Sequence, residues 1–244
     1  MFLYIIRHGH PVYAPEEKLT ELGHRQARAL VPRLTEAGIT RIFSSPLRRA
    51  RETAQPTADA LGLPIEIEPW TSEELAWERF TVPAKGDVEA VGGTTWVWYT
   101  DDPGQFVRGK NRDCGDGWAE IDAMKECPQA KDGYAQLVRD SDGFMARLGY
   151  RRDGNDYVIE RPNDERVAVF CHQGFGLTWL SHLLRIPPTI FWNEFDITHS
   201  GVTLLEFRNT KCGRTVPKCL FLSDMSHLFA SDDCNMMYHR EFQV

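Results

Sequence analysis

The sequence lacks an excess of positive charge. Lys and Arg total 28 residues against 35 Asp and Glu, which gives a formal net charge of −7. Surfaces that bind nucleic acid are basic, so this balance argues against a nucleic-acid partner. An anionic substrate would have to be held by cations placed individually around it.

Long apolar runs are also missing. The apolar residues 2–6 end at Arg7, a run that is too short for a membrane-spanning helix and lacks the basic flank of a secretory signal. We therefore expect a cytoplasmic protein with no membrane partner.

Paired cysteine motifs are absent as well. None of the six cysteines has C-x-x-C spacing, so neither a zinc knuckle nor a thioredoxin-type motif is indicated. They stand at positions 114, 127, 171, 212, 219 and 234. We expect reduced thiols.

What the sequence does contain is typical of a soluble α/β protein. Its 244 residues are 42% hydrophobic and 26% charged, enough for one substantial core. Strand and helix patterns alternate from residue 2 to residue 68, which predicts a three-layer sandwich with a mainly parallel mixed sheet and helices on both faces. The predicted strands are residues 2–6, 39–44, 65–68, 167–171, 202–207 and 218–222, and the last two are expected to form a hairpin. The predicted helices are 20–37, one beginning near Pro46, and 177–184.

The middle of the chain has poor periodicity. Between residues 80 and 165 only one clear helix is predicted, at about 134–148, among short pieces rich in Trp, Tyr and Phe. A structureless loop of this length is improbable in a compact domain. We therefore predict a single domain over 1–244 with an inserted cap at about 80–165, beside the site.

Two strand ends carry the first candidate site residues. The strand 2–6 runs into Arg7-His8-Gly9, and the apolar strand 167–171 delivers His172. Ligands bind beyond the carboxyl ends of parallel strands, where a guanidinium suits an anion and a neutral imidazole offers a lone pair. The pattern indicates an anion pocket with a nucleophile in it.

Further charged candidates follow the second and third strands. Arg48, Arg49 and Arg51 lie in one helical turn, where at most one or two can face the sheet and the others must be solvated. Glu73 and Glu74 stand among aromatic residues, a setting that raises the pKa of a carboxyl group and keeps a proton donor available. Adjacent side chains cannot both face the pocket, so one of the two is solvated.

Taken together, these motifs resemble the histidine phosphatase superfamily, the phosphoglycerate-mutase-like group. The resemblance covers about the first 75 residues and 166–207. The matching segments are Arg7-His8-Gly9, residues 19–27 (LTELGHRQA), residues 44–54 (SSPLRRARETA), and His172 with Gly174.

The resemblance implies a phosphohistidine mechanism without a metal or another cofactor. His8 would be the nucleophile, and preplaced guanidinium and imidazolium groups of Arg7, Arg49 and His172 would bind the phosphoryl oxygens. Arg49 is preferred to its neighbours because the arginine of the family stands directly before the alanine of that motif. Glu73 or Glu74 would protonate the leaving group; the residue that follows favours Glu74, whereas counting from Pro69 favours Glu73.

The sequence departs from the family pattern after Gly9. Where mutases and many phosphatases carry an acidic or hydroxyl residue and then an Asn, this chain has residues 10–13, His-Pro-Val-Tyr. We therefore expect a phosphatase acting on a small phosphorylated metabolite, with a phosphoglycerate-mutase-type transfer as the alternative.

Two other classes of protein stay open. His8 and His10 have a spacing that could place two ligands of a metal-dependent hydrolase on a strand, although the sequence indicates no third ligand. A non-catalytic phosphate-binding module is the second, and it would be signalled by loss of the site residues, all of which are present.

Overall fold

A six-stranded sheet lies at the centre of the molecule. The computed structural model of the chain describes residues 1–12, 16–86, 88 and 91–229. The strand order is β11-β9-β1-β8-β2-β3. These strands are β1 (Phe2–Arg7), β2 (Arg41–Ser44), β3 (Ile65–Ile67), β8 (Arg166–Cys171), β9 (Val202–Glu206) and β11 (Lys218–Asp224).

Four of these strands run parallel and two run antiparallel to them. β1 pairs with β8, β8 with β2 and β2 with β3 in parallel, whereas β9 pairs antiparallel with both β1 and β11. The predicted mainly parallel mixed sheet and the predicted hairpin are confirmed. Continuous apolar runs in β1 and β8 suit this centre, since both faces of these strands are covered.

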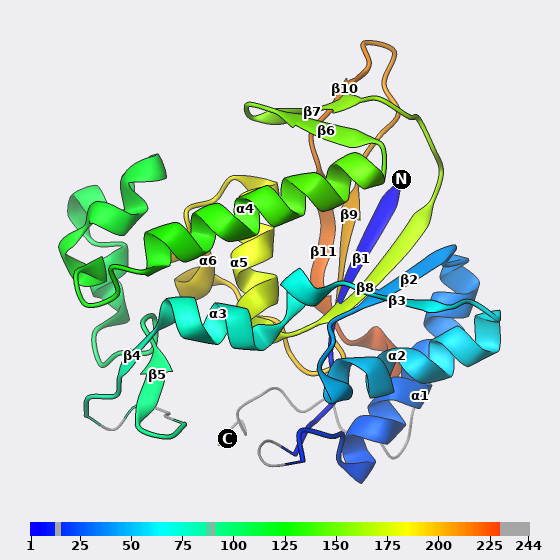
Figure 1. The fold of residues 1–244 in the computed structure, drawn as a ribbon, viewed down its shortest axis with the longest axis horizontal. Coiled ribbons are helices and arrows are strands. Elements are labelled where there is room, and N and C mark those ends of the chain that lie inside the picture. Colours follow the sequence, from blue (N-terminus) through cyan, green and yellow to red (C-terminus); the bar gives the residue numbers. More distant parts are fainter. Residues whose placement is uncertain (13–15, 87, 89–90, 230–244) are drawn as a thin grey trace.

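Successive side chains of the strands enter two cores on opposite faces of the sheet. Leu3 and Ile5 pack with helices α3 (Glu73–Phe80), α4 (Ala130–Arg147) and α5 (Gln173–Leu184). Tyr4 and Ile6 pack with α1 (Glu21–Ala37) and α2 (Arg48–Leu61). Figure 1 shows these two helical layers on either side of the sheet, as the alternation of strand side chains requires.

The first helix begins close against the turn that follows β1. Thr20 accepts a hydrogen bond from the N–H of Gly23 at 3.1 Å and caps α1 as expected, and Gly38, with φ of 67°, ends it. Gly23 has no room for a side chain, because a Cβ there would lie 2.2 Å from the carbonyl oxygen of His10. The site turn and α1 are therefore in direct backbone contact.

We expect Gly23→Ala to lower the free energy of unfolding by roughly 1–3 kcal/mol, since the backbone of His10 must move away. The matched control is Gly143→Ala on α4, where nothing lies within 4 Å of the added Cβ. That change should raise stability by about 0.5–1 kcal/mol, the usual gain of alanine over glycine in a helix. Urea denaturation of both variants measures the difference, and equal effects would contradict this close contact.

The segment between β3 and β8 is more ordered than its sequence pattern indicates. Its aromatic side chains Trp96, Trp98 and Trp118 are buried in the same core as α5. Besides α4, it contains β4 (Thr81–Pro83), β5 (Thr94–Trp96), η2 (Pro103–Phe106), η3 (Gly109–Asn111), η4 (Gly115–Glu120), η5 (Asp122–Met124), β6 (Tyr150–Asp153) and β7 (Asp156–Ile159). The limits of an inserted cap, and the single domain over 1–244, stay predictions.

Several element boundaries differ from the sequence-based expectation. α5 begins at Gln173 rather than at residue 177, directly after His172. The Pro187-Pro188 pair also starts a new helix, α6 (Pro188–Glu194), because proline fits the first turn. The hairpin of β6 and β7 was not predicted; it is joined by β10 (Arg214–Thr215) in a small second sheet. A last short helix is α7 (Ser226–Phe229).

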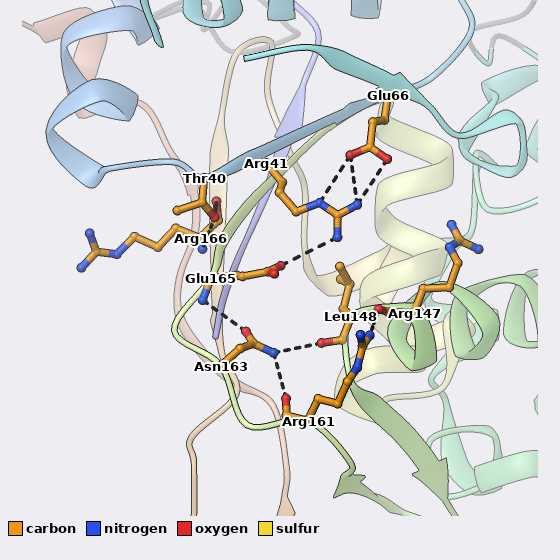
Figure 2. Close-up of polar contacts among 9 residues, drawn as sticks. All are labelled: Thr40, Arg41, Glu66, Arg147, Leu148, Arg161, Asn163, Glu165 and Arg166. Carbon is orange, nitrogen blue, oxygen red and sulfur yellow. Dashed lines mark hydrogen bonds and ion pairs between the residues drawn. The ribbon is translucent and has the colours of Figure 1, made fainter. Parts of the chain in front are cut away.

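A polar network ties the chain together at the amino ends of the strands (Figure 2). The guanidinium of Arg41 donates to Glu66 at 3.0 Å and pairs with Glu165 at 3.8 Å. Asn163 accepts from the N–H of Glu165 at 3.1 Å and donates to the carbonyl of Leu148 at 3.0 Å. These contacts connect the starts of β2 and β8, whereas the candidate site residues follow the opposite ends of β1 and β8.

The thiols of the described cysteines differ in burial. Cys171 is fully buried in the core, as expected, and burial raises the pKa of its thiol. The five described cysteines are all free, and Cys234 lies outside the described residues. Among the described helices, we find none with the length and apolarity needed to cross a membrane.

Candidate active site

Two histidines meet where β1 and β8 end side by side. The parallel register places Arg7 opposite Cys171, so His8 and His172 follow at the same edge of the sheet. Their ring centroids lie 5.1 Å apart, and the exposed fractions are 2% for His8 and 0% for His172. The structure therefore brings these two predicted residues together in a buried position.

The ring of His8 is held in one tautomer. Its Nδ1 lies 2.7 Å from the carbonyl oxygen of Gly9, an acceptor, so Nδ1 carries the proton and Nε2 carries the lone pair. Burial lowers the pKa of His8 well below its usual value, and the neighbouring His172, Arg7 and Arg49 lower it further. His8 is therefore a neutral imidazole near pH 7, the form that can act as a nucleophile.

Two buried arginines flank the histidines. Arg7 is 2% exposed, and its guanidinium donates to the carbonyl oxygen of Ile197 at 2.8 Å and lies 3.0 Å from Nε2 of His199. Arg49 is 5% exposed and pairs with the carboxylate of Glu17 at 3.2 Å. The positive charges of both lower the pKa of His172. Each arginine is thus fixed in direction before any substrate binds.

The start of α2 separates Arg49 from the other two arginines of its turn. Arg48 is exposed and pairs with Glu52 on the same helix, and Arg51 is exposed too. Only Arg49 of the three turns below the surface, toward the two histidines. Its role as a phosphate ligand stays a prediction.

That role predicts that Arg49→Ala weakens anion binding, because one fixed guanidinium of the pocket is lost. We expect the inhibition constant of vanadate or inorganic phosphate to rise by roughly 10–100-fold, since hydrogen bonds to charged groups contribute about 1.5–3 kcal/mol each. Arg48→Ala and Arg51→Ala are the matched controls and should leave the constant within about twofold. A larger effect in either control would mean that the wrong arginine was chosen.

His172 makes one hydrogen bond and keeps one ring nitrogen unused. Its Nε2 lies 2.7 Å from the hydroxyl of Ser45, while Nδ1 is buried with no partner among the described atoms. Burial lowers the pKa of His172 well below its usual value, with the charges of Arg49 and Arg7 acting in the same direction. Burial and the two guanidinium charges therefore favour a neutral ring before substrate binds, in place of the imidazolium that the resemblance implies.

The structure separates the two candidate acids. Oxygens of Glu73 accept from the N–H groups of Gly174 at 2.8 Å and Phe175 at 2.7 Å, in the first turn of α5 beside His172. Glu74 is exposed. Adjacent positions on a helix point about 100° apart, so only one can face the site. The geometry therefore favours Glu73 over the preferred Glu74, because Glu73 lies beside His172 and Glu74 is exposed; the role of the acid stays a prediction.

The environment of Glu73 has opposing effects on its carboxyl group. Desolvation raises the pKa, whereas the N–H groups of Phe175 and Gly174 and the charges of Arg49 and Arg7 lower it. Burial dominates, and the pKa of Glu73 is raised. A carboxyl group with a raised pKa is suited to donate a proton near neutral pH.

Sequence reasoning missed His199, which packs against the nucleophile candidate. Its ring centroid lies 5.5 Å from that of His8, and its Nε2 faces the guanidinium of Arg7. His199 stands just before β9, and an antiparallel strand begins at the edge where its parallel neighbours end. The N–H of Ser200 donates to the carbonyl of His8 at 3.1 Å, which fixes this loop to the site.

His10 lies near the site but is bound to the start of α1. Its Nδ1 is 3.0 Å from the hydroxyl of Thr20, and its ring centroid is 5.3 Å from that of His199. Within the described ranges, no group of three or more His, Cys, Asp or Glu side chains is arranged to hold a metal ion. Of the unusual residues 10–13, the last, Tyr13, lies outside the described residues.

Known proteins are similar to part of the sequence of this chain and to most of its fold. Residues 3–107 match the family model of the histidine phosphatase superfamily (branch 1). A Yersinia pestis protein named "Probable phosphoglycerate mutase" is 37% identical over 75 residues, which cover 28% of this chain and 35% of that protein. The match thus spans about a third of the length of such relatives.

Solved structures are similar over nearly the whole chain. A phosphoserine phosphatase mutant from Entamoeba histolytica in complex with phosphoserine has a TM-score of 0.57 at 19% identity, covering 93% of this chain and 98% of that chain. A mycobacterial glucosyl-3-phosphoglycerate phosphatase has a TM-score of 0.55 at 18% identity, covering 91% and 98%. These likenesses confirm the fold.

Proposed function

We propose, from the premise that residues 3–107 belong to the histidine phosphatase superfamily, that the protein hydrolyses phosphomonoesters through a phosphohistidine on His8. The observation that carries the proposal is the neutral, buried His8 ring, whose Nδ1 is bound to Gly9 so that Nε2 keeps the lone pair. Fixed guanidinium groups stand beside it, where the phosphoryl group of a substrate would lie.

In the first step, Nε2 of His8 attacks phosphorus and the bond from phosphorus to the alcohol oxygen breaks. Glu73 gives its proton to that oxygen, and the alcohol leaves. In the second step, water attacks the phosphohistidine, Glu73 takes a proton from the water, and the bond from phosphorus to nitrogen breaks. Inorganic phosphate leaves, and both residues return to their starting states.

Arg7, Arg49 and His172 would bind the equatorial oxygens of the phosphoryl group. Preplaced donors stabilise the charge that spreads over these oxygens in the transition state. A dianionic phosphate beside His172 raises the affinity of this ring for a proton. The proposal is therefore that His172 is neutral in the empty site and donates from a protonated nitrogen when substrate is bound.

The acceptor of the phosphoryl group is water in this proposal, as in the phosphatases with similar structures. Transfer to a second alcohol, as expected of a mutase, is the alternative that the partial match to "Probable phosphoglycerate mutase" keeps open. The substrate would be a small phosphorylated metabolite; the Entamoeba phosphatase of similar structure binds one such compound, phosphoserine. Independence from metal ions and a cytoplasmic location belong to the same proposal.

The test is turnover of p-nitrophenyl phosphate by the purified chain in buffer containing EDTA. We expect steady hydrolysis with one inorganic phosphate per nitrophenol, unchanged when Mg²⁺ or Zn²⁺ is added. Activity that appears only with added metal would overturn the proposed mechanism. A shortfall of phosphate in the presence of glycerol, with matching glycerol phosphate, would favour the transferase alternative.

A further inference from the structure

A large cavity lies beside the candidate active site and is not explained by phosphate binding. Its volume is about 680 Å³, within the range of pockets that hold ligands of roughly 300–1,000 Å³. This is far more room than a phosphate group requires. The residues of its lining that matter here are Tyr99, Asp101, Gln173, Glu194, Phe195 and Asp196.

Two residues of the cavity lining are close to the candidate phosphate ligands. Gln173, which lines the cavity, directly follows His172 at the start of α5, and donates to Asp196 at 2.6 Å. Asp196 also accepts from the N–H of Ile197 at 2.7 Å, and the carbonyl of Ile197 accepts from Arg7. The cavity therefore begins one residue from His172, at side chains that hydrogen bonds fix and connect to Arg7.

The charge of this cavity is opposite to that of the phosphate pocket. Three carboxylates line it, those of Asp101, Glu194 and Asp196, and its lining within the described residues includes no Lys, Arg or His. Glu194 is paired with Arg112 at 2.5 Å, so the unbalanced charge comes from the two aspartates. A second anionic group on the substrate would be repelled here, whereas an ammonium or a hydroxyl group would find acceptors.

The remaining walls are aromatic. Trp98 and Trp192 stack with centroids 5.7 Å apart and are 2% and 6% exposed, so they form a rigid base. Tyr99 packs edge-on against Trp192, and Phe195, which is 38% exposed, stacks on Phe191. Such walls favour an apolar or planar ring over a short polar chain.

We propose that this cavity binds the alcohol part of the substrate, and that it selects ring-bearing alcohols that are neutral or cationic over those that carry a carboxylate or a second phosphate. The inference rests on the proposed phosphatase function, because it assigns the leaving group of that reaction. It separates this chain from enzymes whose substrates are phosphorylated carboxylic acids.

The experiment compares three benzyl phosphates that differ only in the para substituent: aminomethyl, methyl or carboxylate. All three release a benzylic alcohol, so differences in kcat/KM report on binding in the cavity. We expect the aminomethyl ester to exceed the carboxylate ester by about tenfold or more, and 1 M salt to shrink the ratio by screening. Asp101→Lys should bring the ratio close to 1 or invert it.

The matched control is Asp122→Lys, an exposed charge reversal outside the cavity lining that should leave the ratio unchanged. A preference for the carboxylate ester, or equal effects of the two variants, would overturn the inference while the phosphatase function stands. Turnover of p-nitrophenyl phosphate without turnover of any benzyl ester would overturn it too. No turnover of any ester would overturn both proposals.

Discussion

Replacing His8 by alanine should abolish turnover, with kcat falling at least about 10⁴-fold, because the pocket then lacks its nucleophile. His8 provides the Nε2 lone pair, and the neighbouring His172 is bound to Ser45 through its own Nε2. The measurement is kcat for p-nitrophenyl phosphate. Rapid acid-free quenching with ³²P-labelled substrate should trap an alkali-stable phosphoenzyme in the wild-type protein and none in His8→Ala.

The matched control is His24→Ala, which removes a partly exposed histidine from α1. Its activity should stay within about twofold of wild type, since surface substitutions have small effects. Circular dichroism and thermal unfolding of His8→Ala should resemble the wild-type protein, which assigns the lost activity to chemistry. Wild-type-like turnover in a folded His8→Ala variant would exclude the phosphohistidine mechanism.

Replacing Glu73 by glutamine should reduce activity in a way that depends on the leaving group. We expect kcat for an alkyl phosphate to fall by roughly 10²–10⁴-fold, the usual contribution of a general acid. With p-nitrophenyl phosphate, the rate of the first step, formation of the phosphoenzyme, should fall much less, because nitrophenolate leaves without a proton. Rates of phosphoenzyme formation, measured with both substrates in a rapid-mixing instrument, separate the two cases.

Glu74→Gln provides a control at the neighbouring position. Glu74 is exposed, whereas Glu73 accepts two backbone hydrogen bonds beside His172, so the control should remain close to wild type on both substrates. Equal losses in the rate of phosphoenzyme formation from alkyl and aryl phosphates in Glu73→Gln would show that Glu73 does not donate the proton. A selective loss in Glu74→Gln would return the assignment to that residue.

The raised pKa of Glu73 also fixes the direction of the pH dependence. The acid is protonated below this pKa, so cleavage of an alkyl phosphate should be fast at lower pH and decline as pH rises through it. His8 has its pKa well below the usual value and stays nucleophilic on the acidic side. In Glu73→Gln, the decline on the alkaline side should disappear from the alkyl phosphate profile.

Much of the site could be predicted because it is built on strand ends. The apolar runs before His8 and His172 indicated buried parallel strands, and the edge where such strands end is shared. Arg49 was separable from Arg48 and Arg51 only through the family motif, since helical geometry alone allowed one or two of them to face inward. The fold followed from the same alternation of strands and helices.

The remaining features depended on contacts that a linear pattern does not contain. Whether Glu73 or Glu74 faces the site depends on how α3 is oriented relative to α5. A shift of one residue along α3 turns the side chain by about 100° and would exchange the two. His199 precedes the antiparallel strand β9, and it is the start of this strand, not its end, that lies at the site. The hairpin of β6 and β7 did leave a signal, because Gly154-Asn155, the two residues between its strands, is a common hairpin turn pair, yet the strands are short and charged.

The central place of β1 has a consequence for how the protein is made. This first strand is bordered by β8 and β9, so Leu3 pairs with Val167 on one side and with Leu205 on the other. The ribosome must therefore synthesise most of the chain before β1 has either neighbour. Until then the apolar residues of β1 have no strand to pair with. Such late, long-range pairing is slow and leaves an exposed strand open to aggregation, so the nascent chain should need a chaperone that shields its amino-terminal segment.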